Sequence, residues 1–365
     1  MNFFTIFTYM PYAFFALTMA TFVLPLRLKV RAQAIWAMAL LFCFSKFLCF
    51  NAFGGHPFNP DLPAAIIWTW DWLYSGAMIL SALGLFTVFF RFRAKMWLLP
   101  LIAWGLSAWG LYNGLRVPDV REAELEYADL PPSLDGYRIV QLADLHCSNA
   151  AQRGRTEAVV AKANALGADL ICLTGDLADG KVGRIARHLE PIKELQARDG
   201  VFACMGNHEY YHDYYAWMSQ FYSRAGNIRF LTNECVFPCA GLALAGVPDE
   251  AGWEKGLDPV PDPRMAFAAV TNGEFRVLLQ HRPKGAVESV RELGVRLQLS
   301  GHTHGGIAPV FSPIIASFNG GFVRGLYPLE KSYLYVSPGS GQWGGFPMRL
   351  FNDSEITVLT LRRTK

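Results

Sequence analysis

Five short polar motifs in this chain combine carboxylate, amide and imidazole side chains, which are common ligands of divalent metal ions. All but the lone histidine directly follow apolar runs that predict buried strands, such as residues 137–142 and 170–173. Loops at the ends of strands hold side chains in fixed positions, so the pattern predicts a centre for two divalent metals. In chain order, the motifs are Asp144-Leu-His146, Gly175-Asp176, Gly206-Asn207-His208-Glu209, His281 and Gly301-His302-Thr303-His304-Gly305-Gly306.

Asp176 is the residue best placed to bridge two cations, because Gly175 before it lets the backbone approach closely. Asp144 and His146 lie two positions apart at a strand end, so their side chains project to the same side and can chelate one ion. Two metals held by a shared carboxylate can activate water and neutralise phosphoryl oxygens. The motifs therefore predict hydrolysis of a phosphate ester or pyrophosphate by attack of metal-bound hydroxide.

The remaining motif residues suit supporting roles in the same centre. Asn207 can ligate without adding charge, which leaves the neighbouring His208 to act as acid or electrostatic stabiliser. His302 and His304 can each reach one metal. A lone histidine such as His281 is more often part of a core, but within this ordered set it is expected to be a ligand. Glu209 is equally compatible with the start of a helix and with support for a ligand.

The first third of the chain is strongly apolar and predicts a membrane domain. Four stretches, about residues 3–26, 32–53, 63–90 and 96–112, are each long enough to cross a bilayer once as a helix. The first lacks a basic start and a small-residue cleavage site, so we expect a retained helix rather than a signal peptide. The alternative is a buried bundle in a soluble protein, which would need a polar face on each helix.

Charge predicts the orientation of these spans. Residues 1–116 contain eight basic and two acidic residues, and the basic residues cluster in the loops after the first and third spans. Basic loops favour the cytoplasm, so four crossings in the inner membrane would place everything after Arg116 on the far side. In a hairpin of the second and third spans, Lys46 and Asp71 lie equally far from the turn. We therefore expect them to pair within the membrane, with independent snorkelling as the alternative.

Composition also limits the partners. The chain has 365 residues and a net charge of +3 without a long basic run, so nucleic acid is not an expected partner. The seven cysteines do not form a disulfide framework, and we expect most of them to be small buried apolar residues. A disulfide between Cys235 and Cys239 stays open. The histidines outside the motifs, His56, His188 and His212, are expected at the surface.

Residues 117–365 alternate predicted strands and helices, which indicates an α/β fold of two sheets with helices outside. Helices are expected at residues 155–166, 185–195 and 214–225. The second half is richer in strands, at residues 228–231, 242–247, 275–280, 295–300 and 333–336, with peripheral strands at 123–127 and 356–362.

These motifs resemble the calcineurin-like metallophosphoesterase family, and within it the membrane-anchored bacterial branch. The resemblance covers about residues 117–365 and includes Gly206-Asn-His-Glu-Tyr-Tyr, Gly301-His-Thr-His-Gly-Gly and Trp343…Met348-Arg349-Leu350. It implies a four-layer α/β/β/α sandwich in residues 117–365, preceded by a transmembrane domain of four helices in residues 1–116. One departure is Ile307, where this branch commonly has Gln, and it concerns substrate contacts rather than metal binding.

The resemblance also implies roles for the site residues. His208 would be the catalytic histidine. Independently of the resemblance, Asp, Asn and His ligands suit Mn, Fe or Zn, and the sequence does not choose among these metals. One metal would be held by Asp144, His146, Asp176 and His304, and the other by Asp176, Asn207, His281 and His302.

The substrate is a phosphorylated molecule, and the sequence around the last histidines makes a lipid a candidate. Residues 307–318 are unusually apolar for a loop beside a metal site, so they either pack as ordinary core or line a slot for acyl or polyprenyl chains. Two other functions are alternatives: a catalytically silent membrane sensor or binding module, which would usually have lost a ligand, and a transporter with an ancillary soluble domain.

Overall fold

The computed structural model describes residues 3–53, 58–90, 96–211, 213–271 and 273–364. It divides the chain into two compact units. The helical unit comprises Met1–Leu115 and Trp343–Leu350, and the α/β unit comprises Arg116–Gln342 and Phe351–Lys365. A short segment near the carboxyl end of the chain therefore belongs to the helical unit.

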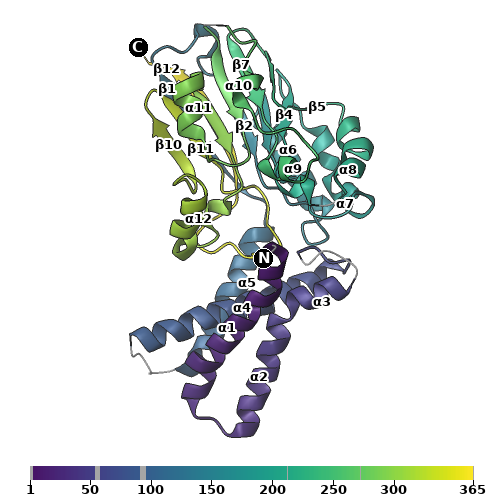
Figure 1. Cartoon of the computed structure of the whole chain (residues 1–365), viewed down its shortest axis with the longest axis vertical. Coiled ribbons are helices and arrows are strands. Elements are labelled where there is room, and N and C mark those ends of the chain that lie inside the picture. Colours follow the sequence, from purple (N-terminus) through teal and green to yellow (C-terminus); the bar gives the residue numbers. More distant parts are fainter. Residues whose placement is uncertain (1–2, 54–57, 91–95, 212, 272, 365) are drawn as a thin grey trace. The chain divides into compact units, whose positions relative to one another are not determined.

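The helical unit contains five α-helices among its described residues (Figure 1). They are α1 (Phe3–Thr18, continued by a π-helical turn at Met19–Val23 and a 3₁₀ turn at Leu24–Leu26), α2 (Val30–Phe44), α3 (Lys46–Ala52), α4 (Ala64–Phe89) and α5 (Leu99–Leu115). Two segments, Tyr9–Leu26 and Ala64–Phe89, are long and apolar enough to cross a membrane. The bent pair α2 and α3 would make a third span, whereas α5 has 17 residues, the lower limit for a crossing.

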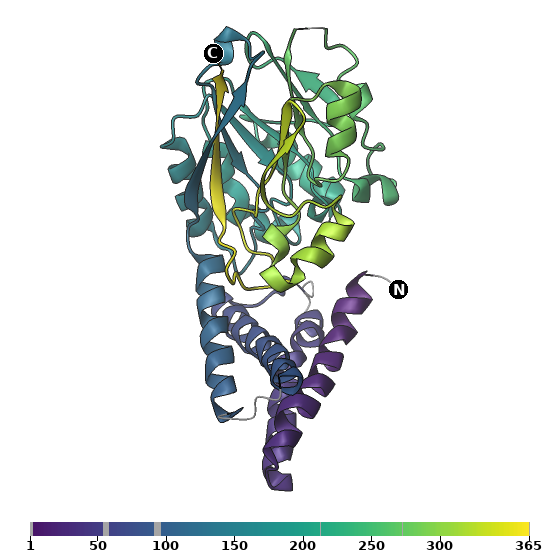
Figure 2. The same cartoon turned by 90° about the vertical axis from the view of Figure 1, so that its left-hand side faces the viewer.

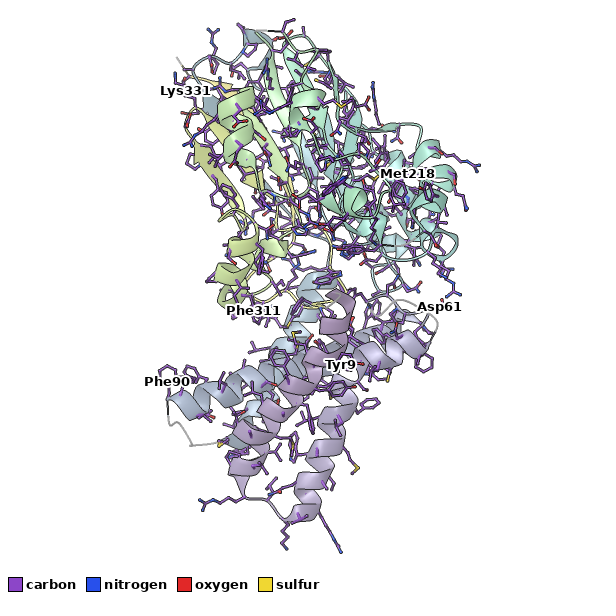
Figure 3. The ribbon with its side chains drawn as sticks, viewed as in Figure 1. Tyr9, Asp61, Phe90, Met218, Phe311 and Lys331 are labelled. Carbon is purple, nitrogen blue, oxygen red and sulfur yellow. The ribbon has the colours of Figure 1, made fainter. Side chains whose placement is uncertain are left out.

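The outer surface of the helical unit is apolar. Most of the large apolar side chains that are exposed in the described part of the chain belong to this unit. Val30 is one of them, and Tyr9 and Phe90 are labelled in Figure 3. Between the helices, small and hydroxyl side chains allow close packing: Thr18 hydrogen-bonds to Ser81. An apolar exterior over a partly polar interior is expected of a bundle in lipid, not of a soluble core.

Lys46 and Asp71 form a buried ion pair, as the sequence predicted. The Lys46 Nζ lies 2.6 Å from Asp71 Oδ1, and both side chains are almost completely buried. The ammonium group also lies 5.0–5.4 Å from the ring centroids of Phe47, Phe50 and Tyr74. Pairing and aromatic contact reduce the cost of burying these charges.

The α/β unit contains two six-stranded sheets. The first has the order β1 (Asp119–Tyr127), β12 (Glu355–Arg363), β2 (Arg138–Leu142), β3 (Leu170–Thr174), β4 (Val201–Cys204) and β5 (Ile228–Phe230). The second has the order β10 (Gly325–Leu329), β11 (Ser332–Val336), β9 (Leu297–Ser300), β8 (Phe275–Leu279), β7 (Leu242–Gly246) and β6 (Glu234–Val236). In Figure 2 the final strand, β12, is yellow and lies beside β1.

Within each sheet, the central strands run parallel to one another. Strands β2 to β5 are parallel, and so are β7, β8, β9 and β11. One apolar cluster joins inward side chains of both sheets, including Ile139, Leu170 and Val277. A second cluster packs α6 (Arg153–Asn164), α7 (Val182–Leu189) and α8 (Tyr214–Gln220) against the first sheet. Smaller clusters involve α10 (Pro263–Ala266) and α11 (Ala286–Leu293) beside the second sheet.

Several sequence expectations need correction. The helix expected over residues 185–195 starts earlier and ends at Leu189, because Pro191 lies in a 3₁₀ turn that follows. The helix expected over 214–225 ends at Gln220, and α11 and β10 were not predicted. His188 is buried rather than exposed, because its Nδ1 accepts a hydrogen bond from the backbone N–H of Arg153, where α6 begins. His56 and His212 lie outside the described residues.

The cysteines are free thiols, Cys235 and Cys239 included. Cys43, Cys147, Cys172 and Cys204 are buried, in keeping with their expected role as small apolar residues.

Candidate metal centre

The polar motifs all follow the carboxyl ends of parallel strands. In the first sheet, β2 leads to Asp144 and His146, β3 to Asp176, and β4 to Asn207 and His208. In the second sheet, β8 leads to His281 and β9 to His302 and His304. Because these strands are parallel within each sheet, their carboxyl ends lie at one edge, and the structure brings all eight side chains together there.

Several residues at this edge adopt left-handed backbone conformations. Five of the predicted residues have positive φ values, and they are Asp144 (51°), His146 (45°), Asp176 (55°), His302 (71°) and His304 (47°). Such conformations are uncommon for residues with a Cβ and cluster at functional sites.

Two glycines make the close approach of the loops possible. A Cβ on Gly301 would lie 2.3 Å from Asp144 Oδ2, and one on Gly175 would lie 2.6 Å from the backbone N of Gly206. Neither position can accommodate a side chain without movement of a predicted ligand or of the backbone beside it.

Asp144, His146 and His304 form the first group of candidate metal ligands, with one ligand atom from each within 4.8 Å of the others. The Nε2 atoms of His146 and His304 are 3.1 Å apart. Asp144 Oδ1 is 4.0 Å from His146 Nε2 and 3.7 Å from His304 Nε2. Two imidazole nitrogens and a carboxylate oxygen therefore face one small volume.

Asp176, His281 and His302 form the second group. His281 Nε2 lies 3.3 Å from Asp176 Oδ2, 3.2 Å from Asn207 Oδ1 and 3.3 Å from His302 Nδ1. The other nitrogen of His281, Nδ1, is 2.7 Å from the backbone carbonyl of Thr174. A hydrogen bond from Nδ1–H to this carbonyl orients the ring so that Nε2 faces the group.

Asp176 connects the two groups. Its Oδ2 is 3.8 Å from His146 Nε2 in the first group and 3.3 Å from His281 Nε2 in the second. Its Oδ1 accepts a hydrogen bond from the backbone N–H of His208 at 2.8 Å. One carboxylate oxygen thus faces imidazole nitrogens of both groups.

Asp179 is a member of the site that the sequence analysis missed. Its carboxylate contacts His146 Nδ1 at 3.1 Å and His208 Nδ1 at 2.5 Å, so it orients two of the predicted residues. The signal was its place three residues after Asp176, on a loop whose backbone pairs in parallel with that of His146 and Cys147. Buried histidines are commonly oriented by such a carboxylate.

Glu209 organises the loops rather than starting a long helix. Its Oε2 accepts backbone N–H groups of Asp176 at 2.9 Å and Gly206 at 2.7 Å, and its Oε1 accepts that of Leu177 at 2.7 Å. The side chain is buried. Of the two sequence readings, support for a ligand is the one that the structure bears out.

Buried carboxylates set the electrostatics. Burial lowers the pKa of His281, but the charges of Asp176 and Asp144 raise it more, to about 10. His208 behaves alike: burial lowers its pKa, whereas Asp176 and Asp179 raise it to about 9. Burial and the charge of His281 lower the pKa of His302 to about 3. The site therefore favours positive charge next to Asp176, and the same field favours a divalent cation.

Comparison with known proteins gives this donor set a family context. The family model of calcineurin-like phosphoesterases matches residues 137–306. The chain is 32% identical over 267 residues to a transmembrane protein with a metallophosphoesterase domain from Danio rerio, which covers 71% of this chain and 60% of that protein. It is 32% identical over 255 residues to an uncharacterized metallophosphoesterase of Campylobacter jejuni, and the match covers 69% of this chain and 66% of that protein.

Another relative, an uncharacterized metallophosphoesterase of Aquifex aeolicus, is matched over nearly its whole length. The identity is 30% over 259 residues, which cover 69% of this chain and 96% of that protein. The chain spans 60% and 66% of the length of the Danio rerio and Campylobacter jejuni relatives, respectively.

The loop-organising role of Glu209 predicts a loss of stability on Glu209→Gln. The amide nitrogen would face backbone N–H donors that now share a carboxylate, so we expect a loss of about 1–3 kcal/mol. Urea unfolding of the full chain in detergent measures the change. Glu157→Gln is the matched control, because Glu157 is half exposed and pairs only with Arg153 among the contacts of the described chain. Equal stability of the two variants would contradict the role of Glu209.

Proposed function

Because this chain belongs to the calcineurin-like metallophosphoesterase family, we propose that it is a membrane-anchored hydrolase of phosphate esters or pyrophosphates that uses two divalent metal ions. The observation that carries this proposal is the position of Asp176 Oδ2, which faces His146 at 3.8 Å and His281 at 3.3 Å. A shared carboxylate oxygen is what two neighbouring cations need to be held close together.

The donor set fits such ions. Carboxylate oxygens, an amide oxygen and imidazole nitrogens suit Mn, Fe or Zn. Asp144, His146, Asp176 and His304 would hold one ion, and Asp176, Asn207, His281 and His302 the other. Bound there, the ions would activate a water molecule and neutralise the charge of the phosphoryl oxygens.

His208 is proposed as the proton donor to the leaving oxygen. Its Nδ1 is held by Asp179 at 2.5 Å, and its Nε2 lies 3.9 Å from Asp176 Oδ2, toward the metal groups. The Asp179 carboxylate, which belongs to neither proposed ligand set, raises the pKa of His208 and so favours the protonated ring. Asp179 stabilises that charge and fixes the ring orientation, as expected for a positioned acid.

The proposed architecture is a four-layer α/β/β/α sandwich that follows four membrane crossings along the chain. Two helical segments are long and apolar enough to cross a membrane, and the bent pair α2 and α3 would be a third crossing. We propose α5 as the fourth crossing. The basic loops after the first and third spans favour a cytoplasmic location for those loops. The catalytic unit would then lie on the extracytoplasmic side of the inner membrane.

A lipid-linked phosphate is the proposed substrate class. The segment after His304 forms a 3₁₀ turn at Pro309–Phe311, whose last residue is labelled in Figure 3, and then α12 (Ser312–Phe318). No residue of α12 is buried. Ile314 is 57% exposed and Phe318 76% exposed, which argues against ordinary core packing. An apolar helix that begins eight residues after a metal ligand fits contact with an acyl or polyprenyl chain.

Substitutions of Asp176 and His208 should separate metal binding from proton transfer. Asp176→Asn should abolish phosphoesterase activity and lower bound metal, because one charge serves two cations. His208→Ala should leave metal content near normal while kcat falls by roughly 10²–10⁴-fold. Elemental analysis and kinetics with a generic phosphodiester measure both effects. Equal metal loss in the two variants would refute this division of roles.

Variants of α12 test the substrate class. Ile314→Ser with Phe318→Ser should raise KM for a lipid phosphate roughly tenfold or more, because each large apolar contact contributes about 1.5–3 kcal/mol. Hydrolysis of a water-soluble aryl phosphate should stay unchanged. Phe237→Ser is the control, since Phe237 is also about half exposed in the α/β unit. Water-soluble nucleotide or sugar phosphates cleaved as efficiently as any lipid phosphate would exclude the lipid proposal.

A further inference from the structure

Residues Trp343–Leu350, which we call the strap, leave the α/β unit and pack within the helical unit. The chain returns to the α/β unit at Phe351 and then enters β12. The strap belongs to the helical unit, but it links two segments of the α/β unit, Arg116–Gln342 and Phe351–Lys365.

The first half of the strap is held by the buried ion pair. Lys46 Nζ donates a hydrogen bond to the carbonyl of Gly344 at 2.8 Å, while Asp71 neutralises it at 2.6 Å. Phe58 packs edge-on against Trp343, with ring centroids 5.1 Å apart. A Cβ on Gly344 would lie 2.1 Å from the carbonyl oxygen of Phe58, so only glycine fits this contact.

The second half of the strap is held by α5. The backbone N–H of Arg349 donates to the carbonyl of Gly110 at 2.8 Å, and Asn113 Nδ2 donates to the carbonyl of Arg349 at 3.4 Å. A Cβ on Gly110 would lie 3.0 Å from Leu350 and 3.1 Å from Met348. The missing side chain at Gly110 therefore lets the strap approach the helix closely.

The chain just before the strap contacts the loop of the first ligand group. The backbone N–H of Ser340 donates to the carbonyl of Ala143 at 2.6 Å, next to Asp144. A Cβ on Gly341 would lie 2.1 Å from the carbonyl oxygen of Leu145. The backbone between Asp144 and His146 is therefore in close contact with the residues that lead into the strap.

The chain just after the strap contacts the other loop of the same group. The Asn352 side-chain amide donates to the carbonyl of His304. Asn352 also fills the space that a Cβ on Gly305 would need. Asn352 is buried, so this contact fixes the loop that carries His304.

We propose that the strap is a positioning element through which the helical unit sets the spacing of Asp144, His146 and His304, with Lys46 and Asp71 as positioning residues. The inference rests on the proposed function, because it concerns that metal centre. The contacts at the two ends of the strap involve the loops of the first ligand group. Asp176 and His281 are held instead by Glu209 and by the carbonyl of Thr174. The backbone N–H of His302 donates to the Asp144 carboxylate at 3.1 Å, which joins the second group to the first.

If the strap has this role, its loss should affect the two metal sites unequally. Residues that orient ligands change metal affinity by roughly 10–100-fold when altered. Loosening the strap should therefore weaken binding of the ion held by Asp144, His146 and His304 more than binding of the ion in the second group, whose ligands Asp176 and His281 are held by Glu209 and Thr174. A general destabilisation of the α/β unit would weaken both.

The test is a Mn²⁺ titration of the full chain in detergent by isothermal calorimetry. The first variant is Lys46→Met with Asp71→Leu, which removes the donor to Gly344 without leaving a buried charge, a replacement that proteins often tolerate. The second is Gly344→Ala, with Gly105→Ala as control because a Cβ at Gly105 meets nothing within 4 Å. Thermal unfolding confirms that each variant is folded.

We expect one of the two Mn²⁺ affinities to fall roughly 10–100-fold in both strap variants, and neither to change in the control. Equal weakening of both sites, or no change in either, would overturn the inference. Hydrolysis of a generic phosphodiester by the unmodified chain is measured separately. Absence of hydrolysis with two normal Mn²⁺ sites would contradict the proposed function and leave the role of the strap intact.

Discussion

The position of the Asp176 carboxylate is the constraint on which the rest of the site depends. An anion buried between two groups of histidines is stable only if positive charge lies on both sides of it. The protein fixes this anion through its own backbone: Glu209 accepts the N–H of Asp176, and Asp176 accepts that of His208. Gly175 and Gly206 supply the space in which these loops approach each other.

The clustering of the eight predicted side chains was predictable because each of them follows a buried strand. Strands ending at Leu142, Thr174, Cys204, Leu279 and Ser300 are apolar runs that are recognisable in the sequence. Parallel pairing then places their carboxyl ends at one edge. Asp179 was missed because its role depends on how the chain turns after Asp176, which no periodicity encodes. His188 was misplaced because its burial depends on packing of α7 against the start of α6.

The helical unit shows where sequence reasoning reaches and where it ends. The ion pair of Lys46 and Asp71 was predictable, since two lone charges at equal distances from a turn have few other partners. Its third partner was not, because the carbonyl of Gly344 is a backbone group without a sequence signal. The segment Trp343–Leu350 is recognisable as part of the family pattern, yet its place in the helical unit follows from packing alone.

The central claim is that two cations share Asp176, and electron paramagnetic resonance of the Mn²⁺-loaded chain tests it most directly. Two Mn²⁺ ions about 3.5–4 Å apart with a bridging ligand are magnetically coupled. The account predicts a coupled spectrum at two equivalents of Mn²⁺, which Asp176→Asn should abolish. A spectrum of isolated Mn²⁺ ions at full occupancy of the unmodified chain would contradict it.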